Sequence, residues 1–137
     1  MSQVRMLACL APVALVVSAP AGLTQEGRAQ QVAGSAVYKT YCVVCHGPAG
    51  KGDGPLADSL RFRPPDLTLL AKKNGGAFPK GRVLRTVDGR KPVKGHGGPD
   101  MPVWGDAFKQ SQDGYGEAAV QAKIEAVVAH VETLQER

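Results

Sequence analysis

Five consecutive residues constrain this chain more than any other part of its sequence. They are Cys42-Val43-Val44-Cys45-His46, and a stretch rich in glycine and proline follows directly. Two cysteines three positions apart lie on the same side of a helical turn, and the next side chain projects close to them. A fold for this chain must therefore bring two thiols and one imidazole together at a single point.

This C-x-x-C-H pattern is typical of the covalent attachment of c-type haem. Each thiol can add to one vinyl group of a haem, and His46 can then bind the iron. Three alternatives explain less. A thioredoxin-like pair needs a βαβ context that the surroundings lack, a zinc site would need the distant His96 and His130, and a plain disulfide leaves the histidine unexplained. The sequence therefore predicts one covalent haem c on Cys42 and Cys45.

The N-terminus has the features of an export signal. Arg5 supplies a positive charge, residues 6–17 are apolar apart from one proline, and small residues follow as far as Ala21. Cleavage is expected after Ala21 or after Ala29, which predicts a periplasmic protein. Because the apolar run is shorter than the about 20 residues that cross a bilayer, we expect no stable membrane span.

Cleavage at either position divides the chain into two parts. Residues 1–29 are expected to be the signal peptide and lead-in, and residues 30–137 the folded domain, with residues 22–32 a short mobile lead-in. Cys9 leaves with the signal, so only the two motif cysteines remain.

The composition agrees with a small domain built around a cofactor. A chain of 137 residues is short enough for a single core. Aromatic residues make up only 5% of it, so few bulky side chains are available to fill that core, and a buried haem can supply the missing apolar volume. We therefore expect the apoprotein to be poorly folded.

A sixth iron ligand, where one is present, is expected from further along the chain. Met101 stands in a loop rich in glycine and proline, which can bring a side chain to a metal without helical spacing, and a thioether suits haem iron. We expect Met101 to be this ligand. The alternatives are His96 and an open coordination site.

Two stretches together resemble class I monohaem cytochrome c. They are the run YCVVCHGPAGKGDGP from Tyr41 to Pro55 and the run MPVWG from Met101 to Gly105, and the resemblance extends from Gly34 to the C-terminus. It implies an all-α fold, a small single domain of four to five helices wrapped round one covalently bound haem.

The resemblance also implies roles for individual residues. Cys42 and Cys45 would be the thioether anchors, with His46 and Met101 as the axial ligands of the iron. A proline carbonyl would lie near the other nitrogen of the proximal histidine. Pro55 and Pro65 both stand at suitable places, and Pro65 is preferred.

Helices can be expected in four places on the pattern of the residues alone. They are residues 32–42, 65–73 with Asp66 as an N-cap, 79–88 with Pro79 in the first turn, and 116–135. The last carries one apolar stripe, Ile124, Val127, Val128, Val131 and Leu134.

In the resembled family, a glycine of the first helix accommodates an aromatic residue of the last helix. Gly34 and Tyr38 match the first helix, whereas His130 stands at the aromatic position and is expected to be a packed structural histidine.

The predicted function is electron transfer by a soluble, exported monohaem cytochrome c, not an enzyme, and a monomer. The alternatives are a haem enzyme or small-ligand sensor with an open or labile sixth site, and a dedicated cytochrome subunit of a larger dehydrogenase or oxidase.

The segment from Lys80 to Lys94 contains six basic residues and a single acidic one, Asp88. This segment is either a solvated face or a patch that attracts an acidic dehydrogenase or oxidase. No nucleic-acid partner is expected despite the net charge of +5.

Overall fold

The computed structural model describes residues 24–90, 101–110 and 116–136, and this part of the chain is entirely helices and loops. In chain order the elements are α1 (Gln25–Tyr41), α2 (Val43–His46), η1 (Ala57–Ser59), η2 (Leu67–Leu69), η3 (Lys72–Asn74), α3 (Lys80–Asp88), α4 (Trp104–Lys109) and α5 (Glu117–Thr133), where η marks a short 3₁₀ turn. The expectation of a small all-α domain is confirmed. None of these helices is long and apolar enough to cross a membrane.

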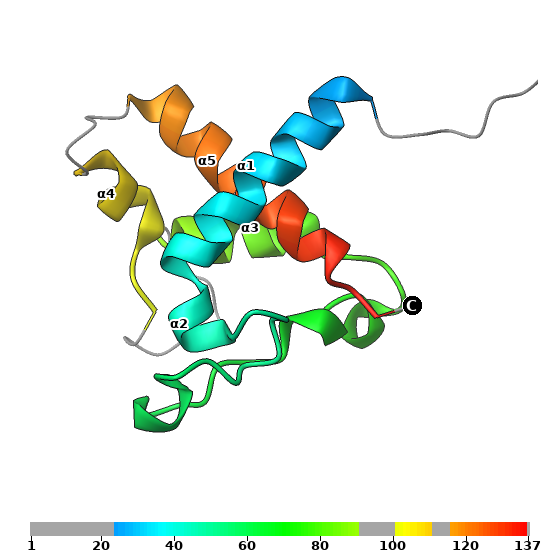
Figure 1. The fold of residues 1–137 in the computed structure, drawn as a ribbon, viewed down its shortest axis with the longest axis vertical. Coiled ribbons are helices and arrows are strands. Elements are labelled where there is room, and N and C mark those ends of the chain that lie inside the picture. Colours follow the sequence, from blue (N-terminus) through cyan, green and yellow to red (C-terminus); the bar gives the residue numbers. More distant parts are fainter. Residues whose placement is uncertain (1–23, 91–100, 111–115, 137) are drawn as a thin grey trace, which may run out of the picture.

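The first and last helices, α1 and α5, cross near their middles, as Figure 1 shows. Gly34 makes this close approach possible, because a β-carbon there would overlap the backbone carbonyl oxygen of Ala126 on α5. Next to the crossing, the ring of His130 lies 5.1 Å from the ring of Tyr38. His130 is therefore packed between the two helices, as the sequence predicts.

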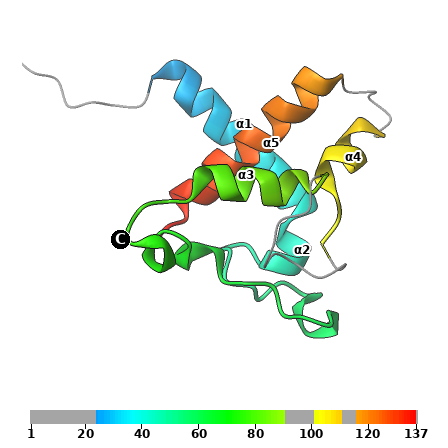
Figure 2. The ribbon, with the colours of Figure 1, turned by 180° about the vertical axis from the view of Figure 1, so that it is seen from behind.

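The apolar stripe of α5 forms the centre of the core. Val120, Ile124, Val127, Val128 and Val131 are almost completely buried, together with Tyr38 of α1, Val83 of α3 and Phe108 of α4. Helix α5 therefore packs against three other helices, α1, α3 and α4, which lie around it in Figure 2. Burial of this face is the main term holding the helices together, because each fully buried aliphatic side chain contributes about 1.5–3 kcal/mol.

Helix α1 begins earlier than the sequence indicates. The lead-in expected for residues 22–32 is wrong from Gln25 onward, because Thr24 is an N-cap whose hydroxyl accepts a hydrogen bond from the Gly27 amide at 3.2 Å. A cut after Ala29 would remove the first residues of this helix. The export signal itself lies outside the described residues.

Between α2 and α3 the chain forms a long loop with three 3₁₀ turns. Asp66 is a cap as predicted, since its carboxylate accepts from the Thr68 amide at 2.9 Å, but residues 65–73 do not form one helix. Leu67 and Leu70 of this segment line the cavity described below and pack against the hydrophobic core. Gln135 binds this loop from the C-terminus, accepting from the Ala71 amide and donating to the Leu67 carbonyl, both at 2.8 Å.

The remaining helix predictions are confirmed with small shifts at the ends. Helix α3 follows Pro79 and ends at Asp88, and Gly89 with its positive φ of 69° is the C-cap. Helix α5 lies within the predicted range 116–135.

Substituting Gly34 by alanine should destabilise the domain, because the added β-carbon forces α1 away from α5. Overpacking of this kind costs about 1–3 kcal/mol in the free energy of unfolding, which denaturant titration measures. Gly81→Ala is the matched control. A β-carbon there has only the tip of Arg85 nearby, at 3.5 Å, so alanine should leave α3 as stable or more stable. Equal effects of the two substitutions would contradict the crossing.

His130 should make the folded protein less stable in mild acid. Burial, and secondarily the charge of Lys39, lowers the pKa of His130 below 6.5, so the unfolded chain binds this proton more readily than the native chain. The contribution of neutral His130 to the stability of the fold is therefore complete above pH about 6.5 and is lost as the pH falls through the lowered native pKa. We expect the thermal midpoint to fall less between pH 7 and pH 5 in His130→Phe than in the wild type. Identical pH profiles would contradict this role.

Candidate functional site

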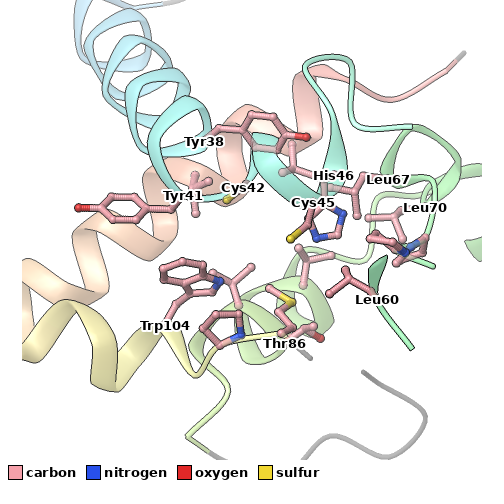
Figure 3. Close-up of a pocket in the computed structure, with 18 of the residues that line it drawn as sticks. Tyr38, Tyr41, Cys42, Cys45, His46, Leu60, Leu67, Leu70, Thr86 and Trp104 are labelled. Atoms are coloured by element: carbon pink, nitrogen blue, oxygen red, sulfur yellow. The ribbon is translucent and has the colours of Figure 1, made fainter. Parts of the chain in front are cut away.

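A cavity of about 300 Å³ lies between the end of α1, the long loop and helices α3, α4 and α5. Most of its wall is apolar. All four site residues predicted from the sequence line it, namely Cys42, Cys45, His46 and Met101. The fold therefore brings together residues almost 60 positions apart in the chain. Figure 3 shows Cys45 and His46 on one wall and Trp104 and Thr86 on another.

The two cysteines lie where α1 passes into α2. Cys42 caps the end of α1, with its amide donating to the Tyr38 carbonyl at 2.9 Å, and Cys45 follows within the single turn of α2. Both are free thiols. Burial, and then the nearby Cys45, raises the pKa of Cys42 to about 12, whereas the reactive thiol of a redox pair has a lowered pKa. The thioredoxin-like alternative therefore disagrees with the electrostatics of the site.

His46 is the last residue of α2 and points its ring into the cavity (Figure 3). Burial lowers the pKa of His46, which favours the neutral imidazole that can bind a metal. The Pro65 carbonyl acts on the ring in the opposite direction, as a hydrogen-bond acceptor would, although Nδ1 lacks a well-formed hydrogen bond. Pro65, and not Pro55, is thus the proline beside the histidine.

The glycine-rich loop after the motif explains how Pro65 reaches this position. The Gly52 amide donates to the His46 carbonyl at 2.9 Å, and a β-carbon on Gly52 would overlap the carbonyl oxygen of Pro64. Gly52 also has a positive φ of 73°, which few side chains tolerate. A second link is the Leu67 amide, which donates to the Gly50 carbonyl at 2.7 Å. The loop therefore binds the Pro64–Pro65 segment directly against the end of α2.

Met101 lines the cavity with Pro102 and Trp104, just before and at the start of α4. The Trp104 ring packs edge-on against Tyr41, with 5.4 Å between ring centroids, and Tyr41 in turn contacts Phe108. Trp104 therefore forms part of the wall on this side of the cavity, while Phe108 is a core residue behind it. The alternative ligand His96 lies outside the described residues.

Three polar residues also line the cavity, and the sequence analysis considered only one of them, Arg82, as part of the basic segment. They are Arg63, Arg82 and Thr86. Arg63 donates to the Gly52 carbonyl at 3.3 Å, so it also contributes to the loop contact described above. The sequence could have indicated Arg63 by its position two residues before Pro65. Arg82 and Thr86 stand one turn apart on α3 and could have been recognised by that spacing.

A protein-family model described as cytochrome c matches residues 31–135. The chain belongs to the cytochrome c family. Searches of curated proteins and of solved structures gave no match. The family binds covalent haem c and acts in haem-based electron transfer, and its members are typically electron carriers and not enzymes. Its match spans both the C-x-x-C-H motif and Met101.

The cavity of this cytochrome suits the cofactor in three respects. Two free thiols lie at the motif spacing, a largely neutral imidazole points between the walls, and the walls themselves are mostly apolar. The buried Nδ1 of His46 also faces a ready acceptor at Pro65, which would orient the ring once the other nitrogen binds iron. Among the described residues, no group of three or more His, Cys, Asp or Glu side chains is arranged to hold a metal ion by itself.

Replacing Cys42 and Cys45 together by alanine should abolish covalent haem attachment, because no thiol then remains to form a thioether in the cavity. Haem staining of denaturing gels measures this directly, and we expect the stained band to disappear. Cys9→Ala is the control, and it should retain full staining because Cys9 is not part of the motif. A stained band in the double variant would require a different attachment.

Proposed function

We propose that this cytochrome is an exported carrier of single electrons in which His46 and Met101 are the two axial ligands of the haem iron. The observation that carries this proposal is that Met101 lines the same cavity as the C-x-x-C-H motif. With His46 and Met101 both bound, the iron would have no open position for a substrate. This favours a carrier over the alternatives of a haem enzyme or a ligand sensor.

The protein residues would tune and protect the cofactor, while the haem supplies the single-electron chemistry. Pro65 would hold the His46 ring in one orientation and increase its basicity as a ligand. Trp104, Leu67 and Leu70 line the cavity and would exclude water, which favours the uncharged form of the centre and raises the reduction potential. A methionine ligand acts in the same direction.

The partners of such a carrier are redox proteins, and we propose that they present an acidic docking face. Lys80 and Arg82 are exposed on α3, and Arg82 also lines the cavity. Positive charge beside the cofactor would attract an acidic dehydrogenase or oxidase, and salt would screen the attraction. The basic segment is smaller than the sequence indicates, because Arg90 is engaged within the protein. Lys91 and Lys94 lie outside the described residues.

The remaining parts of the proposal concern location and assembly. A signal in residues 1–29 would deliver domain 30–137 to the periplasm, where cleavage after Ala21 would leave α1 whole. Redox encounters generally use small, transient interfaces, which agrees with a monomeric carrier. Copurification with a dehydrogenase or oxidase would instead indicate a dedicated subunit.

The test of this function is the spectrum of the holoprotein and of Met101→Ala. We expect the oxidised wild type to be low-spin, with the near-infrared charge-transfer band of methionine-ligated ferric iron. The reduced wild type should bind carbon monoxide only slowly, at a rate limited by the departure of the methionine. Met101→Ala should keep its covalent haem, lose the band, bind carbon monoxide and have a lower reduction potential, because the thioether is gone.

The same measurements distinguish the alternatives. A prompt response of the wild type to carbon monoxide would indicate an open or labile site and support the enzyme or sensor. Identical spectra of the wild type and Met101→Ala would show that Met101 is not a ligand of the iron.

A further inference from the structure

A network of ion pairs joins the ends of three helices next to the cavity. Arg90 donates through Nε to Asp88 at 2.5 Å, and its Nη1 lies 2.7 Å from Glu117 Oε1. Lys109 contacts the other oxygen of Glu117 at 3.1 Å. Asp88 ends α3, Lys109 ends α4 and Glu117 begins α5. We call these four residues the Arg90 network.

Arg90 is the central member of this network. Asp88 lies at the C-terminal end of α3, where the helix dipole disfavours a negative charge, and Arg90 offsets that charge directly. Glu117 accepts from both Arg90 and Lys109, and their proximity lowers the pKa of Glu117. Without Arg90, the carboxylate on α3 loses its cation and the link between α3 and α5 is broken.

The network also touches the first turn of α4. Gly105 is buried there, and a β-carbon at this position would overlap both Asp88 Oδ1 and the Arg90 side chain. The Arg90–Asp88 pair therefore lies directly on the backbone of α4. Together with Lys109, this gives α4 contacts with the network at both of its ends.

The position of α4 determines where Met101 emerges. Helix α4 has only six residues and no side-chain N-cap, and such a short helix is not stable without tertiary contacts. Met101 precedes Trp104, the first residue of α4, by only three positions. The aromatic contacts of Trp104 and Phe108 with Tyr41 hold α4 toward α1. The Arg90 network holds α4 toward the end of α3 through Gly105 and toward the start of α5 through Lys109.

We propose that Arg90 is a positioning residue for the axial ligand. By holding α4 through Gly105 and Glu117, it keeps Met101 in the cavity and limits the fraction of molecules in which this ligand leaves the iron. The inference rests on the proposed function, because it takes Met101 to be the ligand. It assigns Arg90 a role distinct from that of the exposed cations of α3, which face solvent.

The test compares Arg90→Gln with Arg85→Gln in the holoprotein. Both remove one positive charge from the same region, but Arg85 is exposed on α3 and has no ion pair among the described residues. Carbon monoxide binds the reduced protein only when the ligand has left, so its rate measures the open fraction. We expect this rate to rise roughly two- to tenfold in Arg90→Gln, as two partly exposed ion pairs imply, and to stay unchanged in Arg85→Gln.

Two further variants approach the network from other sides. Glu117→Gln removes an exposed carboxylate and should raise the carbon monoxide rate less than Arg90→Gln does. Gly105→Ala should also raise it, because the β-carbon displaces the Arg90–Asp88 pair from α4. Salt should accelerate carbon monoxide binding in the wild type and have little effect in Arg90→Gln, because the screened pairs are already absent.

The outcomes separate this inference from the function on which it rests. If the wild type lacks the methionine band, the ligand assignment fails. If the band is present and Arg90→Gln matches Arg85→Gln in rate and salt dependence, the role of Arg90 is overturned. A purely structural role would lower the denaturant midpoint of Arg90→Gln while leaving its carbon monoxide rate and reduction potential at wild-type values, and this result would also overturn the inference.

Discussion

The close crossing of α1 and α5 at Gly34 is the contact on which the rest of the structure depends. It lets the backbone of α1 rest on Ala126, and this brings Tyr38 and the end of α1 against the most buried part of α5. The haem-binding motif begins directly after α1, so the crossing also fixes where the two thiols lie. The Tyr38 hydroxyl extends this control by donating to the Gly47 carbonyl at 2.8 Å, just beyond His46.

Two sets of contacts then shape the cavity, one on the side of His46 and one on the side of Met101. On the histidine side, the glycine-rich loop carries Pro65 to the imidazole through backbone hydrogen bonds, and these are short and local. On the methionine side, Met101 depends on a six-residue helix held by aromatic packing and by ion pairs at its ends. Backbone hydrogen bonds shielded from water are less sensitive to salt than partly exposed ion pairs. We therefore expect the contacts on the methionine side to be the more sensitive to salt.

Cys42, Cys45, His46 and the cofactor could be proposed from one short motif, because the chemistry of haem attachment requires fixed spacing along the chain. Met101 could be proposed from the chemistry of its side chain and from its place in a loop. The apolar stripe of α5 was equally clear, since its period of 3.6 residues extends over several turns. The segment 65–73 was less clear. Its apolar residues fit a helical pattern, but Leu67 and Leu70 are used for the cavity wall and the core. Hydrogen bonds with Gln135 engage the Ala71 amide and the Leu67 carbonyl in place of helical partners.

Arg90 shows a different limit of sequence reasoning. In the sequence it is one of six cations in a basic segment, and only the fold separates it from the others by placing Glu117 beside it, 27 positions away. The sequence by itself determined the cofactor, the ligand candidates and the helical class, because these depend on residue type and on spacing within a few turns. Tertiary structure alone decided which proline faces the histidine, which cation is internal and what holds α4. These depend on contacts between distant segments, and no local pattern encodes them.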